Sequence, residues 1–375
     1  MKIVLAPDKF KGSLSSLEFC SAVEEGISRI CDQVEILKLP LADGGDGTIE
    51  IANYYLGGTM VEVEVNNPLF RRITASYLYA EISGTAFIEM AEASGLWLLK
   101  EEERDCKNTT TYGTGELILD AIQKGAKRII LGIGGSATND CGIGMATALG
   151  YKFLDKNNKE VKPIGASLSQ ITSIDDSNVV SKLNQVEFQV ACDVNNPLYG
   201  KNGAAHVYGK QKGASEEDIE MLDLGLKSFS EVLTAEFNVQ PQGIKGAGAA
   251  GGMGIAAIVF LQASLESGIQ VMKELANFDD QIADADWIIT GEGKLDVQTL
   301  SGKTIDGVLK SAKIYAIPVA VFCGQIDLDK DALNNFGISY AKDVLSMSKD
   351  LDDALHNSRK HLVTIAEVFA EKLVS

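Results

Sequence analysis

The fold is decided by the stretch KIVLAPDKFKGSLSSLEFCSAVEEGISRI, residues 2–30. The segment KIVLA predicts a buried strand, and residues 16–30 repeat apolar side chains with a helical period. Ser15 and Glu18 have the spacing of a capping box, which predicts that the helix begins near Ser16. The residues between them, PDKFKGSL, therefore form the loop of a β/α unit, as in parallel sheets.

The same pattern recurs along the chain and predicts an α/β fold. Each further Val- and Ile-rich strand is followed by a loop of Gly, Asp, Asn or Lys, and ligands bind beyond the carboxyl ends of parallel strands. These predicted strands are VEILKLP (34–40), KRIILGI (127–133), VEFQVAC (186–192), DWIITG (286–291) and PVAVFCG (318–324). Residues 59–89 instead alternate with period two, which predicts antiparallel strands and the start of a second domain.

Length, charge and cysteine content restrict the class of protein. A chain of 375 residues is too long for one ordinary core, so two domains are expected. The net charge of −18 argues against nucleic acids and anionic membranes as partners. The six cysteines form no CxxC pair, and no segment has the pattern of a signal peptide or a membrane span, so we expect a cytoplasmic protein with reduced thiols.

A loop with charged residues follows each of the first two predicted strands. In PDKFKG, Asp8, Lys9 and Lys11 precede a helix, where lysines could hold phosphate oxygens; the alternative is a solvated surface loop. In LADGGDGT, residues 41–48, Asp46 could simply cap the next helix, which leaves Asp43 unexplained. Glycines around a carboxylate permit the close approach of Mg²⁺ and substrate oxygens.

The loop GIGGSATND, residues 132–140, supports two interpretations. Its backbone N–H groups and hydroxyls could bind one phosphate chain. It also fits G-x-G-x-x-A, with Asp155 some twenty residues further on, which is typical of a dinucleotide fingerprint and leaves an NAD(P)-dependent oxidoreductase of a small hydroxy acid open. The second glycine run, GAGAAGG (246–252), predicts either a flexible loop or a close helix contact.

A third charged loop is GEGKLDVQTLSGKT, residues 291–304. It is not a Walker motif, because the residue five positions before Gly302 is Val297. Its charged residues combine acids with cations, as a phosphate and metal site requires; the alternative is a set of surface salt bridges. These residues are Glu292, Lys294, Asp296 and Lys303.

Six motifs in order resemble those of the bacterial type-1 glycerate kinases: APDKFKGSLSS, PLADGGDGT, TTYGTGELI, GIGGSATND, GAGAAGGMG and ITGEGKLDVQT. One departure is Cys141, where that family is expected to have glycine. The resemblance implies ATP- and Mg²⁺-dependent phosphorylation of D-glycerate, usually to 2-phosphoglycerate. It also implies two α/β domains with the active site in the cleft between them. These are a discontinuous three-layer domain with a restriction-endonuclease-like core, residues 1–59 plus 284–375, and an inserted flavodoxin-like domain, residues 60–283.

On this interpretation each candidate has a role. Lys9 and Lys11 would neutralise phosphate oxygens, and Asp43 or Asp193 would accept the proton of the glycerate hydroxyl. The metal would be held by Asp46, Glu292 or Asp296. Substrate and nucleotide would be bound by Asp8, Gly44, Gly45, Arg71, Gly134, Gly135, Ser136, Asn139, Lys294 and Lys303. Arg71 is the candidate for the glycerate carboxylate, its alternative being a surface strand residue. A non-catalytic phosphometabolite sensor also stays open.

Overall fold

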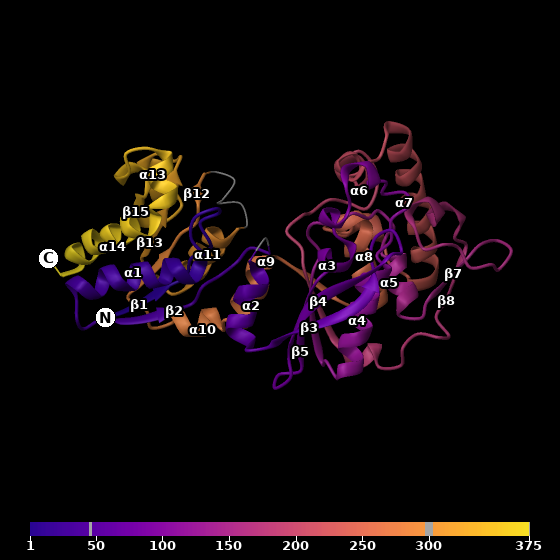
Figure 1. Ribbon diagram of the computed structural model, residues 1–375, viewed down its shortest axis with the longest axis horizontal. Helices are drawn as coiled ribbons and strands as arrows, with labels where there is room; N and C mark the ends of the chain where they lie inside the picture. Colours follow the sequence, from indigo (N-terminus) through magenta and orange to yellow (C-terminus); the bar gives the residue numbers. More distant parts are fainter. Residues whose placement is uncertain (45–46, 297–302, 375) are drawn as a thin grey trace. The chain divides into compact units, whose positions relative to one another are not determined.

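The computed structural model describes residues 1–44, 47–296 and 303–374. It divides the chain into two compact units, shown in Figure 1. The first unit is made from both ends of the chain, Met1–Tyr55 and Ser267–Ser375, and the second is the inserted stretch Leu56–Glu266. Residues 267–283, which the expected boundaries gave to the inserted domain, lie in the first unit.

Both units mix helices and strands, so the α/β class is confirmed. The first unit contains β1 (Lys2–Leu5), β2 (Glu35–Lys38), β11 (Trp287–Thr290), β12 (Lys294–Leu295), β13 (Val319–Cys323), β14 (Gln325–Ile326) and β15 (Ile338–Asp343). Its helices are α1 (Ser16–Ile30), α2 (Thr48–Leu56), α9 (Gly268–Leu275), α10 (Phe278–Ile282), α11 (Thr304–Ile314), α12 (Lys330–Asn335), α13 (Leu351–His356) and α14 (Ser358–Val374).

The second unit has its own strands and helices. The strands are β3 (Thr59–Asn66), β4 (Arg72–Ala80), β5 (Thr85–Glu89), β6 (Arg128–Gly132), β7 (Lys152–Leu154), β8 (Ser173–Asp175), β9 (Glu187–Ala191) and β10 (Ser264–Glu266). The helices are α3 (Ala91–Ser94), α4 (Tyr112–Lys124), α5 (Ile143–Ala148), α6 (Ala204–Tyr208), α7 (Glu216–Phe237) and α8 (Ala249–Leu261). In the described part of the chain, no helix is both long enough and apolar enough to cross a lipid bilayer.

The main sheet of the first unit is entirely parallel, with the order β15-β13-β11-β1-β2. Numbered along this unit alone, that order is 2-1-3-4-5, which is the order of flavodoxin-like sheets. The expectation that the inserted domain is the flavodoxin-like one is therefore wrong. The flavodoxin order belongs to the discontinuous unit, which was expected to have a restriction-endonuclease-like core.

The predicted first β/α unit is confirmed. Ser15 and Glu18 form the capping box, and α1 begins at Ser16. One face of the sheet packs against α1 and α14, and its residues Ile3 and Phe322 are fully buried. Gly26 lets these two helices approach closely, because a Cβ atom there would lie 2.4 Å from the Val363 carbonyl oxygen.

The sheet of the second unit has the order β10-β9-β6-β5-β4-β3. Strands β3, β4 and β5 are antiparallel, which confirms the prediction for residues 59–89, and β5, β6, β9 and β10 are parallel. The core of this unit lies between the sheet and helices that include α4, α7 and α8. The carboxyl ends of β6 and β9 therefore meet at one edge, where the loops after Gly132 and Ala191 begin.

Replacing Gly26 by Ala tests the contact between α1 and α14. Although alanine has the better helix propensity, its methyl group has no room, so we expect the free energy of unfolding to fall by about 1–3 kcal/mol. The measurement is urea unfolding followed through Trp287, with Ser21→Ala on the exposed side of α1 as the matched control. An unchanged unfolding midpoint for Gly26→Ala would contradict the packing.

Candidate functional site

The candidate site of the first unit lies where β1 and β11 end side by side. Leu5 pairs with Ile289, and the Asp8 backbone N–H donates to the Gly291 carbonyl at 2.8 Å, so the loops that follow leave the sheet together. Strand β1 has β2 on its other side, which makes this the position where the strand order reverses. In open parallel sheets, ligands bind at such a switch point.

Asp8 is a buried carboxylate in the loop after β1, with 9% of its surface exposed. It accepts hydrogen bonds from the Thr304 hydroxyl and from the Lys9 backbone N–H, both at 2.7 Å. Burial, and after it the negative charge of Asp43, raises the pKa of Asp8 to about 6. The two hydrogen bonds favour the charged form and oppose this shift, so they offset part of the cost of burying the carboxylate near Asp43.

The pKa of Glu292, in the loop after β11, is shifted further than that of Asp8. Burial raises its pKa to about 8, and the charge of Asp8 adds to the effect, while the ammonium of Lys303 opposes it. Its buried Oε1 atom has no hydrogen-bond partner among the described residues. The fold therefore places two carboxyl groups together that repel each other and lack full compensation, as is typical of functional sites.

The other predicted residues of this unit differ in their surroundings. Gly268 lets α9 pack on the loop after β2, because a Cβ atom there would lie 2.4 Å from the Asp43 carbonyl oxygen. Lys9 extends toward Gly47: a Cβ atom added to Gly47 would lie 3.8 Å from the Lys9 Nζ atom. Lys294 is 52% exposed and pairs with Asp327 at 2.7 Å, as in the salt-bridge alternative.

The remaining candidates of this unit are more exposed to solvent or lie outside the described residues. Lys11 and Lys303 are exposed, and Asp296 is half-buried and acts on Glu292 through its charge. Gly45 and Asp46 lie outside the described residues. Thr304, which donates to Asp8, is a site residue that sequence reasoning missed, because its GKT context was considered only as a Walker motif.

The inserted unit has a candidate site of its own in the loop after β6. Gly134 and Gly135 are exposed there, while Ser136, Thr138 and Asn139 are buried. Both side-chain polar atoms of Asn139 and the Thr138 hydroxyl have no partner among the described residues. Buried polar groups are nearly always hydrogen-bonded, so this loop has unused donors and acceptors.

Asp140 fixes this loop from inside. Its carboxylate accepts from the Thr111 backbone N–H and hydroxyl, both at 2.8 Å, and from the N–H groups of Gly142 and Gly144 at 3.2 Å. Burial nevertheless raises its pKa. Next to it, Cys141 has a φ of +50°, a left-handed conformation that explains why the family is expected to have glycine at this position.

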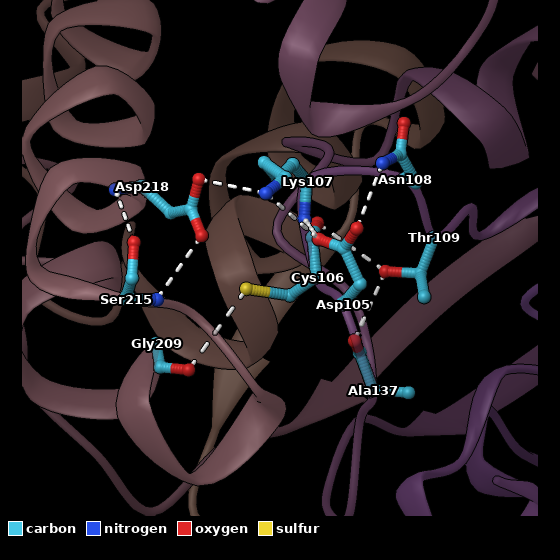
Figure 2. Close-up of polar contacts among 9 residues, drawn as sticks. All are labelled: Asp105, Cys106, Lys107, Asn108, Thr109, Ala137, Gly209, Ser215 and Asp218. Carbon is cyan, nitrogen blue, oxygen red and sulfur yellow. Dashed lines mark hydrogen bonds and ion pairs between the residues drawn. The ribbon is translucent and has the colours of Figure 1, made fainter. Parts of the chain in front are cut away.

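The segment 105–109 joins this loop to the turn before α7, as Figure 2 shows. Thr109 donates its hydroxyl hydrogen to the Ala137 carbonyl at 3.0 Å. Lys107 pairs with Asp218 at 2.8 Å, which raises the pKa of Lys107 and lowers that of Asp218. Asp218 is also the capping-box partner of Ser215 at the start of α7. The segment therefore ties the loop after β6 to the N-terminus of α7.

Two further candidates of the inserted unit are surface residues. Arg71 is 62% exposed and pairs with Glu103 at 2.6 Å, as in its surface alternative. Asp193 is exposed in the loop after β9. The structure thus gathers Asp8, Asp43, Glu292 and Lys303 in the first unit and the 134–139 loop in the second, and it gives Arg71 a structural partner.

The geometry does not favour the dinucleotide fingerprint. Asp155 accepts from the backbone N–H groups of Asn157 at 2.8 Å and Lys159 at 2.9 Å, so it stabilises its own turn. It follows β7, which pairs with β8 in a separate two-stranded sheet. The other glycine run packs closely, since a Cβ at Gly251 would lie 2.1 Å from the Thr138 carbonyl oxygen.

Comparison with known proteins agrees with the site. Residues 3–374 match the glycerate kinase family. The chain belongs to that family. It is 42% identical to glycerate kinase from Bacillus subtilis (strain 168) and to glycerate 2-kinase from Escherichia coli (strain K12). Both alignments cover 100% of this chain and 98% of the relative. The crystal structure of a Salmonella typhimurium LT2 protein, described provisionally as glycerate kinase 2, superposes with a TM-score of 0.89 at 42% identity, covering 100% of this chain and 98% of that one.

Replacing Asp140 by Asn tests its structural role. An amide oxygen accepts fewer hydrogen bonds than a carboxylate, and the amide N–H groups would face donors. We expect the free energy of unfolding to fall by about 2–4 kcal/mol. Guanidinium unfolding of the variant and of Asp176→Asn, an exposed-loop control in the same unit, measures the difference. Equal stability of the two variants would show that Asp140 is not the anchor of the loop.

Glu292→Gln tests how much the charged form of Glu292 destabilises the folded protein, which depends on pH. Because the folded-state pKa is raised to about 8, the folded protein binds this proton more tightly, and its stability falls as pH rises from about 4.5 to 8. Glutamine removes that loss, so at pH 9 the variant should be more stable than the parent by about 1–3 kcal/mol.

Chemical unfolding at pH 5 and pH 9 checks the Glu292 prediction, with Glu371→Gln on the exposed face of α14 as the control. The gain should be much smaller at pH 5 than at pH 9. A variant that loses stability at pH 9 would mean that the charged form of Glu292 is favoured by the fold.

Proposed function

We propose that this chain is an ATP-dependent kinase that phosphorylates D-glycerate on its 2-hydroxyl, giving 2-phosphoglycerate and ADP. The observation that carries the proposal is the pair of buried Asp8 and half-buried Glu292, with the charge of Lys303 nearby, at the switch point of a parallel sheet. Phosphoryl transfer depends mainly on positioning and charge stabilisation, which such a site supplies. The names of the relatives at 42% identity support the substrate and the product.

Magnesium fits the chemistry of this acid pair. Mg²⁺ is bound by one or two carboxylates together with waters and phosphate oxygens, so a dedicated protein cage is not required. Among the described residues, no group of three His, Cys, Asp or Glu side chains is arranged to hold a metal. Glu292, with its unpartnered Oε1, and the adjacent Asp8 are the groups that would hold it. The ion would supply neutralisation of phosphate charge, and Asp46 and Asp296 stay as alternative ligands.

The remaining roles follow from charge and position. Lys9 and Lys303 would neutralise phosphate oxygens, because each lies in a loop at this edge of the sheet. Asp43 is the candidate base: its charge acts on both Asp8 and Glu292, so its carboxylate belongs to the same cluster. Asp193 is the alternative base. In the inserted unit, the loop 134–139 would donate hydrogen bonds to glycerate or to the nucleotide.

The partners of this enzyme would be small molecules. The net charge of −18 disfavours nucleic acids and anionic membranes. We also infer that the protein works in the cytoplasm, since all six cysteines are free.

The function is tested by an assay of ADP release from Mg-ATP with D-glycerate, L-glycerate and glycerol in parallel. We expect turnover with D-glycerate and much less with glycerol, which lacks the carboxylate. Phosphorus NMR of the product should show a 2-phosphate. Absence of turnover with all three compounds would refute the kinase proposal, and ligand binding without ADP release would favour the sensor.

The base is tested by Asp43→Asn and Asp193→Asn. A general base contributes roughly 10²- to 10⁴-fold, so the variant that lacks it should lose turnover by about that factor while it still binds ATP. Asp327→Asn, which removes the carboxylate that pairs with Lys294 and accepts from the Gln325 amide, is the control. Wild-type turnover in both Asp43→Asn and Asp193→Asn would exclude an aspartate base at these positions.

A further inference from the structure

Lys212 is a buried lysine of the inserted unit that the proposed roles do not use. It ends the short 3-10 turn Lys210–Lys212 and has only 3% of its surface exposed. Its Nζ atom donates to the Ser136 hydroxyl oxygen and to the Thr138 carbonyl, both at 2.7 Å. The other buried lysine of the described residues, Lys273, has the carboxylate of Asp279 at 3.3 Å.

The charge of Lys212 has no such partner within ion-pair distance among the described residues. The nearby carboxylate is Asp140, which already accepts from four donors of the chain. Burial lowers the pKa of Lys212 to about 8, and the groups that act against this shift are Cys106 and Asp140. A buried ammonium without a counter-ion is costly, so the fold keeps it at the expense of stability.

The contact between Lys212 and Ser136 determines where the Ser136 hydroxyl hydrogen can point. An ammonium group can only donate, so the Ser136 oxygen accepts, and its own hydroxyl hydrogen must point to another acceptor. The described residues provide none for it. Directly before Ser136, Gly134 and Gly135 are exposed, and their backbone N–H groups have no acceptor in the described chain. Gly135 has a φ of +70°, a conformation found in anion-binding turns of successive N–H groups.

The turn and the loop are held at a fixed spacing by the segment shown in Figure 2. The Cys106 backbone N–H donates to the Lys212 carbonyl at 3.2 Å. The Thr109 hydroxyl donates to the Ala137 carbonyl at 3.0 Å, as Figure 2 shows. Lys212 and Ser136 are thereby positioned before any ligand arrives, which lowers the cost of binding.

We propose that residues 134–136 bind an anionic oxygen of a substrate, a carboxylate or a phosphate, with Lys212 beneath the loop as the counter-charge. The Ser136 hydroxyl and the backbone N–H groups of Gly134 and Gly135 donate to the ligand. Lys212 is a positioning residue, because it orients the Ser136 hydroxyl and makes the loop electropositive in an acidic protein. The identity of the ligand rests on the proposed function: it is the glycerate carboxylate or a nucleotide phosphate.

Calorimetric binding to the full chain distinguishes these sources. D-glycerate alone, ADP alone and inorganic phosphate are titrated into the parent, Lys212→Met and Ser136→Ala. Lys210→Met is the matched control, since it removes the same charge from an exposed position of the same turn. A hydrogen bond to a charged group is worth about 1.5–3 kcal/mol, so Lys212→Met should weaken one substrate by about 10- to 100-fold, and Lys210→Met should not. Loss confined to D-glycerate assigns the carboxylate, and loss confined to ADP assigns the phosphate.

The pH dependence separates a charge from a merely structural role. In the parent, affinity for the assigned ligand should fall between pH 7 and pH 9.5 as Lys212 loses its proton, and in Lys212→Met it should be flat over this range. Should Lys212→Met fail to fold, Ser136→Ala with its smaller perturbation provides the same binding comparison.

The proposal is overturned if all three ligands bind the folded variants within about twofold of the parent. Failure of the proposed function is a different result: no ADP release by the parent with D-glycerate, while phosphate still binds the parent and loses affinity in Lys212→Met.

Discussion

The pairing of β1 with β11 is the constraint on which the site of the first unit depends. The Thr290 hydroxyl donates to the Ala6 carbonyl at 2.7 Å across a separation of 284 residues in the chain. Because the strands are parallel, their carboxyl ends coincide, and the loops that start there bring Asp8 to the side of Glu292. In the sequence, the whole inserted unit lies between β1 and β11. The site of the first unit therefore exists only when both ends of the chain have folded together.

Both units place poorly compensated polar groups in loops at strand ends. Glu292 and Lys212 each have a pKa shifted by burial toward the neutral form, and Asn139 is buried with its amide unpartnered. Such groups reduce stability, and the large buried cores around both sheets offset the loss. This distribution is what a phosphoryl-transfer enzyme requires, since it must hold charge ready for a substrate that brings the opposite charge.

The features that the sequence predicted well are local. The strand at residues 2–5, the start of α1 at Ser16 and the antiparallel stretch 59–89 depend on signals within a few residues. Strand order depends on distant pairings that no local signal predicts, and the flavodoxin-like order, which the resemblance implies for the inserted unit, is found in the discontinuous unit. Asp155 fits a motif spacing, yet its hydrogen bonds are within its own turn. Lys212 has no local signature, because its burial results from packing against the segment near Cys106, and Thr304 reaches Asp8 only through the pairing of distant strands.

The central claim is that the acid pair after β1 and β11 is the metal and phosphate site of a kinase. The most direct measurement is a crystal structure with Mn²⁺, a non-hydrolysable ATP analogue and D-glycerate, in which the manganese is located by its anomalous scattering. The account predicts an anomalous peak within coordinating distance of a carboxylate oxygen of Glu292 or Asp8 and of phosphate oxygens of the nucleotide. A peak that is ordered elsewhere, with Asp8 and Glu292 contacting neither metal nor phosphate, would contradict it.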